Sequence, residues 1–173
     1  MFLVDNSGLL LDTILLWLVQ RNNCPVRLMV KKLILKFQKL HPDAVLPSYL
    51  HETDAAFDIY TIETKELKPG ERYIFKTGLI SEIPQGWWVS IRDRSGNAAK
   101  FGLHTMAGVI DSGYRGEWGV VVVNLGESEH MVEKGERIAQ GILEQVIQPE
   151  IREVQKLSDS DRGEKGFGST GRK

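Results

Sequence analysis

The chain has 173 residues and a formal net charge of −1, with acidic and basic residues in nearly equal number. This length supports one domain with a substantial core, and the mixed charge gives no basis for bulk electrostatic binding to nucleic acid or to an anionic membrane. The single cysteine, Cys24, excludes an internal disulfide framework and a cysteine-rich zinc site, so a reducing, cytoplasmic setting is expected.

Residues 1–28 differ in composition from the rest of the chain and are expected to form a separate apolar extension. The apolar run from Leu9 to Val19 contains Asp12. As a helix it would span about 16 Å, whereas a membrane crossing needs roughly 30 Å. No Lys or Arg precedes this run and no small-residue cleavage site follows it, so a signal peptide is not indicated either. We expect an amphipathic or poorly ordered extension ahead of a main domain that begins at Met29.

From Met29 onward, short segments rich in β-formers alternate with turn signals such as Pro69-Gly70 and Pro84-Gln85-Gly86. This spacing is typical of a sandwich or barrel and predicts an all-β domain over residues 29–157. The dense valine run from Val120 to Val123 predicts a buried strand. Strands are expected over residues 33–37, 57–60, 72–76, 87–92, 120–123, 130–132, 138–142 and 151–154.

One short helix is predicted from Ser95 to Gly102, with Ser95 as its N-cap and Gly102 as its stop. A hydroxyl, the free N–H groups of a first helical turn and the guanidinium of Arg94 would together suit a phosphate. Gln140 lies within an otherwise apolar strand, so it either faces a polar site or lies on the solvent side of that strand.

The loop from Gly108 to Glu117 is a candidate site for catalysis. Asp111 and Tyr114 lie where a bent loop meets the strand that contains Val120, and rigid strands commonly present functional loops in this way. The glycines at 108, 113 and 116 are expected to allow tight or left-handed turns around Asp111. The histidines show no ligand spacing and are interpreted as structural or surface residues.

After residue 157 the chain becomes polar and glycine-rich, so residues 158–173 are expected to form a flexible C-terminal tail. Residues 166–171 match the dinucleotide fingerprint by letter, but only two residues follow Gly171, so no helix can complete that motif. The backbone N–H groups and hydroxyls that remain, beside Arg162, suit the wrapping of phosphates. Phe167, between two glycines, is unusual for a tail that only adds solubility.

Five segments resemble, in order, the five motifs of the trimeric dUTP diphosphatase (dUTPase) family. The resemblance extends from about Met29 to the end of the chain, and residues 1–28 lie outside it. The matching segments are residues 55–59, 94–98, 108–116, 135–140, and 162–163 together with 166–171.

The resemblance implies a jelly-roll-like β-fold that assembles as a homotrimer with active sites shared between subunits. It also implies hydrolysis of dUTP to dUMP and pyrophosphate with Mg²⁺, a reaction that provides dUMP for thymidylate synthesis and keeps uracil out of DNA. No nucleic-acid or membrane partner is expected.

The residue roles are likewise carried over from the motifs. Asp111 would be the general base that activates water, and Tyr114 would pack against the deoxyribose and disfavour a 2′-hydroxyl. Asp58 would lie near the water shell of the metal, and the backbone of the hairpin around Thr105 would read uracil. The phosphates would contact Arg94, Ser95, Gly96 and Gln140, and the closing tail would add Arg162, Phe167 (stacked on uracil), Gly168, Ser169 and Thr170.

The sequence departs from the family pattern at four positions. Ala56 replaces a usual glycine, which is expected to restrict the backbone there. Asn97 and Gly141 replace residues that are commonly apolar, which is expected to soften the packing behind the site. Thr105 stands where relatives vary, so no base-reading role is assigned to its side chain.

Two alternatives remain beside the diphosphatase. One is a dCTP deaminase, which shares the fold. Residues 103–108 resemble the corresponding segment of that enzyme. That reaction needs a carboxylate on the strand after the third motif, where this chain has Val121. The other is a trimeric β-module that binds or regulates without turnover. Ammonia release from dCTP would favour the deaminase, and degraded catalytic positions would favour the binding module.

Overall fold

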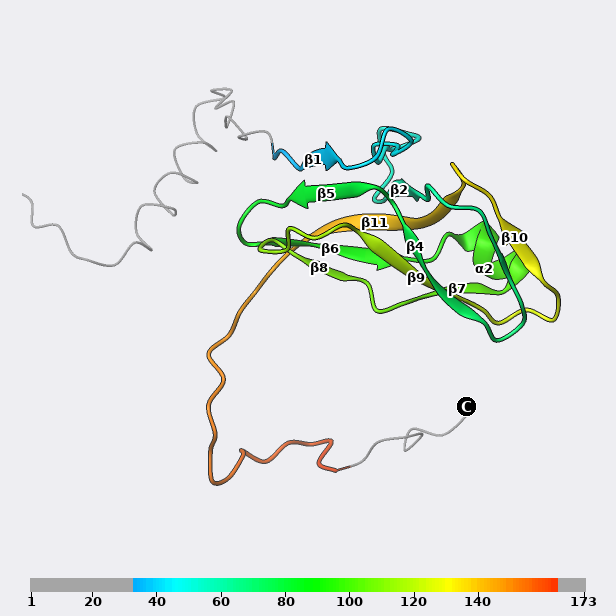
Figure 1. The fold of residues 1–173 in the computed structure, drawn as a ribbon. Coiled ribbons are helices and arrows are strands. Elements are labelled where there is room, and N and C mark those ends of the chain that lie inside the picture. The colour runs from blue at the N-terminus through cyan, green and yellow to red at the C-terminus, as the bar shows by residue number, and fades with distance from the viewer. Residues whose placement is uncertain (1–32, 165–173) are drawn as a thin grey trace, which may run out of the picture. The chain divides into compact units, whose positions relative to one another are not determined.

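The structure is a computed structural model, and it describes residues 33–164. These residues form an all-β fold with one short helix, as predicted (Figure 1). No helix among residues 33–164 is long and apolar enough to cross a membrane. The elements are β1 (Lys36–Lys39), β2 (Phe57–Tyr60), β3 (Lys65–Leu67), β4 (Arg72–Lys76), β5 (Leu79–Glu82), β6 (Trp87–Arg92), α2 (Ser95–Phe101), β7 (Leu103–Met106), β8 (Val109–Asp111), β9 (Gly119–Asn124), β10 (His130–Val132) and β11 (Arg137–Gln145).

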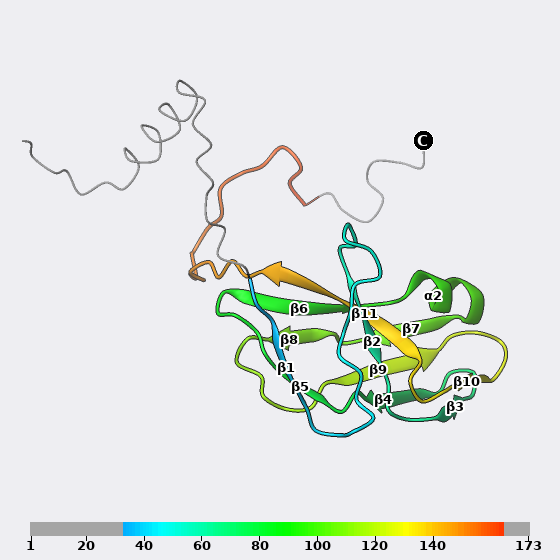
Figure 2. The same cartoon turned by 90° about the horizontal axis from the view of Figure 1, so that it is seen from above.

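The strands pair in antiparallel fashion into two larger sheets and two short ribbons. The larger sheets have the orders β2-β11-β6-β8 and β4-β9-β7, and the ribbons pair β1 with β5 and β3 with β10 (Figure 2). Phe57 and Val89 from the first sheet, and Phe75 and Val122 from the second, belong to a single buried cluster. The core therefore joins the two sheets. The edges of the sheets remain available to position polar side chains.

The valine run forms β9, whose side chains alternate between buried and partly exposed positions. Val120 and Val122 are buried in the core, whereas Val121 and Val123 are only partly covered. This alternation follows from the two-residue period of a strand. It explains how one apolar run supplies the core and also places Val121 on the opposite face, in a surface cleft described below.

Gly141 on β11 lies directly opposite Phe57 on β2, and the aromatic ring covers the glycine. A Cβ built on Gly141 would lie 2.4 Å from the Phe57 ring. The expected softer packing is therefore not observed, because the ring fills the space that a side chain would occupy. Asn97, the other departure, is buried and donates from Nδ2 to the Arg137 carbonyl at 3.1 Å.

We expect Gly141→Ala to destabilise the protein by about 1–3 kcal/mol, because the new methyl group would displace the buried Phe57 ring. Thermal or denaturant unfolding measures this change. Gly113→Ala is the matched control, because a Cβ at Gly113 meets no atom within 4 Å. Equal unfolding midpoints for the two variants would contradict the packing argument.

Three features of the fold differ from the sequence expectations. The strand predicted over residues 151–154 is absent, because no strand of the described chain pairs with residues 146–160, and unpaired backbone groups do not form a strand. Strand β1 begins at Lys36 rather than at residue 33. Strands β3, β5 and β7 were not predicted; β3 and β5 are short, and no turn separates β7 from the helix.

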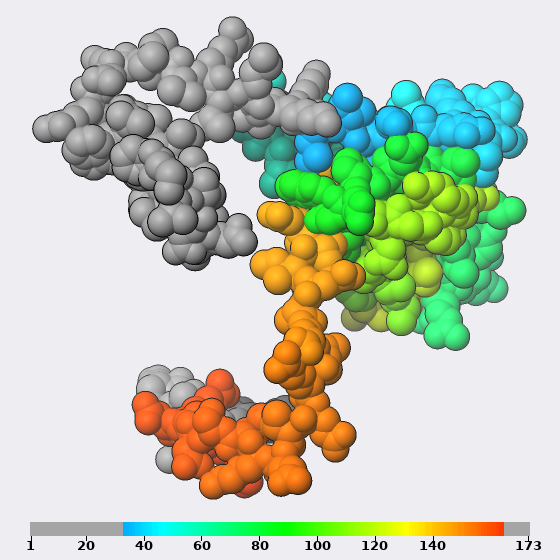
Figure 3. Space-filling view, turned by 90° about the vertical axis from the view of Figure 1, so that its left-hand side faces the viewer, coloured from blue at the N-terminus to red at the C-terminus, as the bar shows by residue number. Residues whose placement is uncertain are grey.

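The predicted division into residues 1–28, 29–157 and 158–173 stays a prediction, since residues 1–32 and 165–173 lie outside the described chain. Residues 146–164, which follow β11, contain no strand or helix, and Ile147 and Ile151 are 86% and 95% exposed. Figure 3 shows this segment in orange, leading out of β11.

Candidate active site

Strand register brings the first group of candidate residues together on one face of the four-stranded sheet. Gln140 on β11 lies opposite Asp58 on β2 and opposite Arg92 on β6. Asp58 and Gln140 share a face because directly opposed residues on paired strands point the same way. A cleft on this face is lined by Asp58, predicted to lie near the metal, and by the predicted phosphate-site residues Arg94, Ser95, Gly96 and Gln140.

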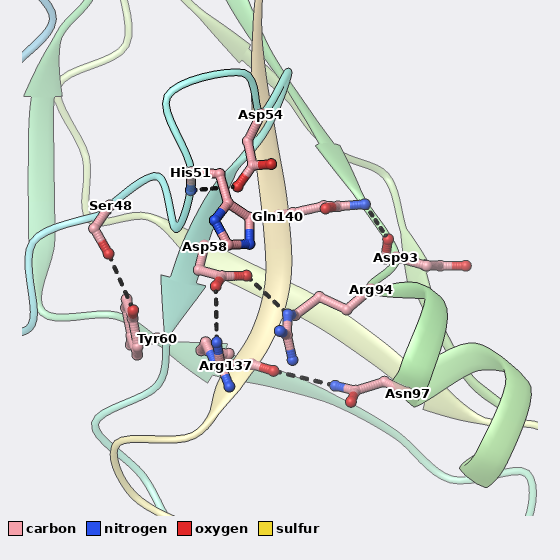
Figure 4. Close-up of polar contacts among 10 residues, drawn as sticks. All are labelled: Ser48, His51, Asp54, Asp58, Tyr60, Asp93, Arg94, Asn97, Arg137 and Gln140. Atoms are coloured by element: carbon pink, nitrogen blue, oxygen red, sulfur yellow. Dashed lines mark hydrogen bonds and ion pairs between the residues drawn. The ribbon is translucent and has the colours of Figure 1, made fainter.

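Asp58 pairs with two arginines: Arg94, which lines this cleft, and Arg137, which does not (Figure 4). Arg94 donates from Nε to Asp58 Oδ1 at 2.8 Å, and Arg137 donates from Nη1 to Oδ2 at 3.3 Å. The Asp58 side chain is only 14% exposed, so the carboxylate is a firm anchor. The pairing fixes the direction of Arg94 while its two terminal nitrogens remain able to donate to a ligand. Arg137, which had been given no role, is thus part of the cleft's charge network.

Helix α2 begins at Ser95, but its N-cap residue is Arg94, and no side chain caps it by a hydrogen bond. The predicted capping role of Ser95 is therefore wrong. Ser95 is exposed and lines the cleft, and its hydroxyl does not cap the helix backbone. The predicted stop is confirmed: Gly102 takes a left-handed φ of 68° at the helix C-terminus.

Gln140 lies on the cleft side of β11, which resolves the choice that the sequence left open. Its Nε2 donates to the Asp93 carbonyl at 2.7 Å (Figure 4). This bond ties the amide to the end of β6 and fixes its orientation. The position expected to need glycine, Ala56, has no positive φ, so alanine imposes no backbone strain there.

A second cleft contains Asp111 and Tyr114. Asp111 ends β8, lies opposite Trp88 on β6 and is exposed. Tyr114 donates from its amide to the Asp111 carbonyl at 3.1 Å and from Oη to the Glu117 carbonyl at 3.0 Å. These bonds fix the ring beside the acid. Val121 lines the same cleft, so no carboxylate stands at the position that the deaminase alternative requires.

The glycines around Asp111 have different structural roles. Gly108 takes a left-handed backbone, with φ 108°, whereas Gly113 lies in a tight turn and Gly116 in a bend, both without positive φ, so the expected tight or left-handed turns around Asp111 are present. Gly116 is needed for another reason, since a Cβ there would lie 2.3 Å from Tyr114 Oη. The glycine therefore leaves the space that the tyrosine ring occupies.

The turn between β7 and β8 is fastened to the end of β6 by Asp93. Asp93 Oδ1 accepts hydrogen bonds from the amide and the hydroxyl of Thr105, both at 2.6 Å. Asp93 Oδ2 lies 2.8 Å from His104 Nδ1. Partial burial opposes ionisation of this carboxyl, but the hydrogen bonds from Thr105 and His104 outweigh it and lower the pKa of Asp93. Because its hydroxyl is engaged in this way, Thr105 is anchored to Asp93, the residue that follows β6.

The two clefts share no lining residue, although Ile91 near the end of β6 lines the cleft that contains Asp111. Trp88, opposite Asp111, and Arg92, opposite Gln140, are separated by about 13 Å along the strand. A general base must lie within hydrogen-bond reach, about 3 Å, of the group it deprotonates. The backbone positions of Asp111 and Gln140 in one chain are therefore separated by much more than hydrogen-bond reach.

The structure thus gathers the predicted residues into two groups rather than one. Arg162 is described and exposed, in the turn that Gly163 closes onto Ser160. Phe167, Gly168, Ser169 and Thr170 lie outside the described residues. Sequence reasoning missed Arg137, Asp93, and the cleft residues His51 and Asp54. The sequence feature that could have identified Arg137 was its position in the fourth motif, two residues before the core residue Ala139.

The fold and the two clefts define a class of all-β protein with an aspartate-anchored arginine and an exposed serine in one cleft and an exposed acid beside a tyrosine in another. Residues 43–171 match the family model described as dUTPase. The chain belongs to the dUTPase family.

Individual relatives agree with this family assignment. The deoxyuridine 5′-triphosphate nucleotidohydrolase of Clostridium tetani is 44% identical over 140 residues, which cover 80% of this chain and 97% of that protein. The protein of the same name from Nautilia profundicola is 46% identical over 140 residues and 99% of its length. Among solved structures, the dUTPase of Staphylococcus bacteriophage 80alpha with dUPNHPP superposes with a TM-score of 0.75 at 34% identity, covering 80% of this chain and 98% of that chain.

Proposed function

We propose that this protein hydrolyses dUTP to dUMP and pyrophosphate. The observation that carries the proposal is the exposed Asp111 carboxylate beside Tyr114, in a cleft that also contains the turn between β7 and β8. A water deprotonated by Asp111 attacks the α-phosphorus, the bond to the bridging oxygen of the β-phosphate breaks, and pyrophosphate leaves. The product supplies dUMP for thymidylate synthesis, and removal of dUTP keeps uracil out of DNA.

The phosphates bind in the first cleft. Arg94, oriented by Asp58, donates to phosphate oxygens, and the exposed Ser95 hydroxyl stabilises the leaving pyrophosphate. Gln140, held by its bond to Asp93, and the backbone of Gly96 complete this cleft. The tail then closes over the nucleotide. It contributes further contacts from Arg162, Phe167, Gly168, Ser169 and Thr170.

The base binds at the turn in the second cleft. Within residues 33–164, the amide and the carbonyl of Ala107 have no hydrogen-bond partner, and Ala107 is exposed. An adjacent donor and acceptor on the backbone suit the edge of a uracil ring, which also carries both. The ring of Tyr114, on the wall of the same cleft, supports the sugar.

The donor groups in the first cleft fit a Mg²⁺ ion that arrives with the nucleotide. No cluster of three or more His, Cys, Asp or Glu residues that could hold a metal occurs within residues 33–164. Mg²⁺ commonly keeps several waters and binds through one or two carboxylates and substrate phosphates, so such a cluster is not required. Asp58, beside Arg94, would hold the ion through water. The bound ion would neutralise charge on the triphosphate.

Active sites shared between the subunits of a homotrimer account for the separation of the two clefts. Asp111 of one subunit and Arg94 of another would meet on one nucleotide. The segment after β11 supports the same assembly, because Ile147, Ile151 and Leu157 are exposed and are available to pack against another subunit. A chain with one cysteine suits the reducing cytoplasm.

The proposal is tested by measuring pyrophosphate release from dUTP, UTP, dCTP and dTTP, with Mg²⁺ and with chelator. Release from dUTP in strong preference to the others, lost with chelator, is the expected result. Ammonia release from dCTP would instead identify a deaminase, and binding of dUTP without turnover would identify a binding module. Light scattering in the same buffer gives the mass of the assembly.

We expect Tyr114→Ala to reduce the ratio of kcat/KM for dUTP over UTP by about tenfold to hundredfold, because the ring fills the space that a 2′-hydroxyl would need. Gly116→Ala should move the ratio in the same direction, since its Cβ would displace the ring. Gly113→Ala, with no atom near its Cβ, is the control. An unchanged ratio in Tyr114→Ala would exclude this role for the ring.

A further inference from the structure

Asp93, just after β6, bonds to Gln140 of one cleft and to Thr105, which precedes the turn in the other cleft. Its side chain holds Thr105 on β7 through two hydrogen bonds of 2.6 Å. Its main-chain carbonyl accepts the 2.7 Å bond from Gln140 of the phosphate cleft. The side chain and the main chain of one residue therefore serve different clefts, and a side-chain substitution separates the two functions.

The turn that follows Thr105 has an unfavourable backbone conformation. Ala107 has φ 62°, and among residues 33–164 it is the only non-glycine residue with positive φ. Such a conformation costs about 1–3 kcal/mol for a residue with a side chain and persists only where its surroundings impose it. Two contacts impose it here: the Ile91 amide donates to the Gly108 carbonyl at 2.8 Å on one side, and Asp93 holds Thr105 on the other.

The contact at Gly108 cannot fix the turn alone. It restrains the residue that enters β8, whereas Met106 and Ala107 depend on how β7 ends. Thr105 is the last residue before them with an anchor outside β7 and its partner β9, and that anchor is the Asp93 carboxylate. Asp93 is 28% exposed on its side chain, so these hydrogen bonds form in partial isolation from water.

We propose that Asp93 is a positioning residue that holds residues 106–108 in the conformation that binds the base, and that it thereby sets affinity and selectivity for uracil. This inference rests on the proposed function, which places the base against the Ala107 backbone. Asp93 touches no reacting atom. Its effect reaches the nucleotide through Thr105 and the turn, so its loss should affect base binding and leave the chemical step nearly intact.

Kinetics of substituted proteins test the proposal. Asp93→Ala should raise KM for dUTP about tenfold and lower the selectivity for dUTP over dCTP about tenfold, with kcat within about threefold of wild type. Asp93→Asn retains an oxygen that accepts from Thr105, so it should restore both values to within about threefold. Thr105→Val, which keeps the amide donor but loses the hydroxyl, should give an intermediate effect. His104→Ala, which removes only the contact to Oδ2, is the control.

Inhibition by deoxyuridine and by pyrophosphate separates the two clefts. In Asp93→Ala the inhibition constant of deoxyuridine should rise about tenfold, whereas that of pyrophosphate should not change, because Gln140 bonds to the main-chain carbonyl that the substitution retains. A merely structural role for Asp93 would reduce the fraction of folded enzyme. That would lower the maximal rate and leave KM, both inhibition constants and the selectivity ratio unchanged.

Hydrogen exchange without substrate gives a readout that does not depend on activity. The Thr105 amide, which donates to Asp93, should exchange at least about tenfold faster in Asp93→Ala, and the Phe75 amide in β4 should be unaffected. Unchanged exchange at Thr105, or unchanged KM and selectivity in an active Asp93→Ala enzyme, overturns the proposal for Asp93. A wild-type protein that does not hydrolyse dUTP overturns the proposed function, and the exchange result is still obtained.

Discussion

Asp111→Asn should reduce kcat for dUTP hydrolysis by at least about a hundredfold and leave the affinity for dUTP within about threefold of wild type. The substitution keeps the shape of the side chain and removes only its ability to accept a proton from water, a capacity that contributes about a hundredfold to ten-thousandfold to a rate. Asp111 is exposed at the end of β8, so the neutral amide does not disturb the core. Single-turnover pyrophosphate release and equilibrium binding of dUTP measure the two effects.

Glu129→Gln is the matched control for Asp111→Asn, since it removes one carboxylate charge at an exposed position outside both clefts. Its rate should equal that of wild type. If Asp111→Asn keeps a rate within tenfold of wild type, another residue is the base and the cleft assignment fails. A parallel loss of binding and rate would instead show that the carboxylate acts in nucleotide binding.

Truncation after Asp161 should leave folding and assembly intact while hydrolysis falls by at least about hundredfold. The deletion removes Arg162 and Phe167 but no strand of the two sheets. The expected loss reflects the phosphate contacts and the exclusion of water that the tail would supply. Circular dichroism and light scattering establish that the fold and the assembly survive, and pyrophosphate release gives the rate.

Mixing the two inactive proteins tests whether the tail acts across subunits. If the tail of one subunit covers a site whose Asp111 belongs to another, truncated chains and Asp111→Asn chains should rescue each other when refolded together. A working site needs its acid from a truncated chain and its tail from an Asp111→Asn chain, so equal random assembly should restore about one quarter of wild-type activity. Mixing the separately folded proteins without subunit exchange is the control. Mixed assemblies that stay inactive would show that the tail closes over its own subunit.

Local sequence patterns predicted most of the strands, because the signals involved are short in range. The valine run of β9, the segment from Phe57 to Tyr60 and the helix stop at Gly102 follow from side-chain period and from backbone preferences that neighbouring residues determine. The same patterns misjudged residues 151–154, where two β-branched residues, Ile151 and Val154, have no partner strand. Whether a segment becomes a strand depends on a partner elsewhere in the chain, and composition does not specify that partner.

Sequence by itself also determined the chemistry of this protein: an acid on a loop, a tyrosine near it, arginine and serine at a helix start, and their order along the chain. Only the tertiary structure decided which of these side chains share a cleft. Register placed Gln140 beside Asp58, and β6 separated Asp111 from Gln140, because a rigid strand fixes a distance between residues that lie close in sequence. The carboxylate of Asp93 bonds to Thr105, twelve residues later, only because the ends of β6 and β7 lie side by side. No local sequence pattern predicts that contact.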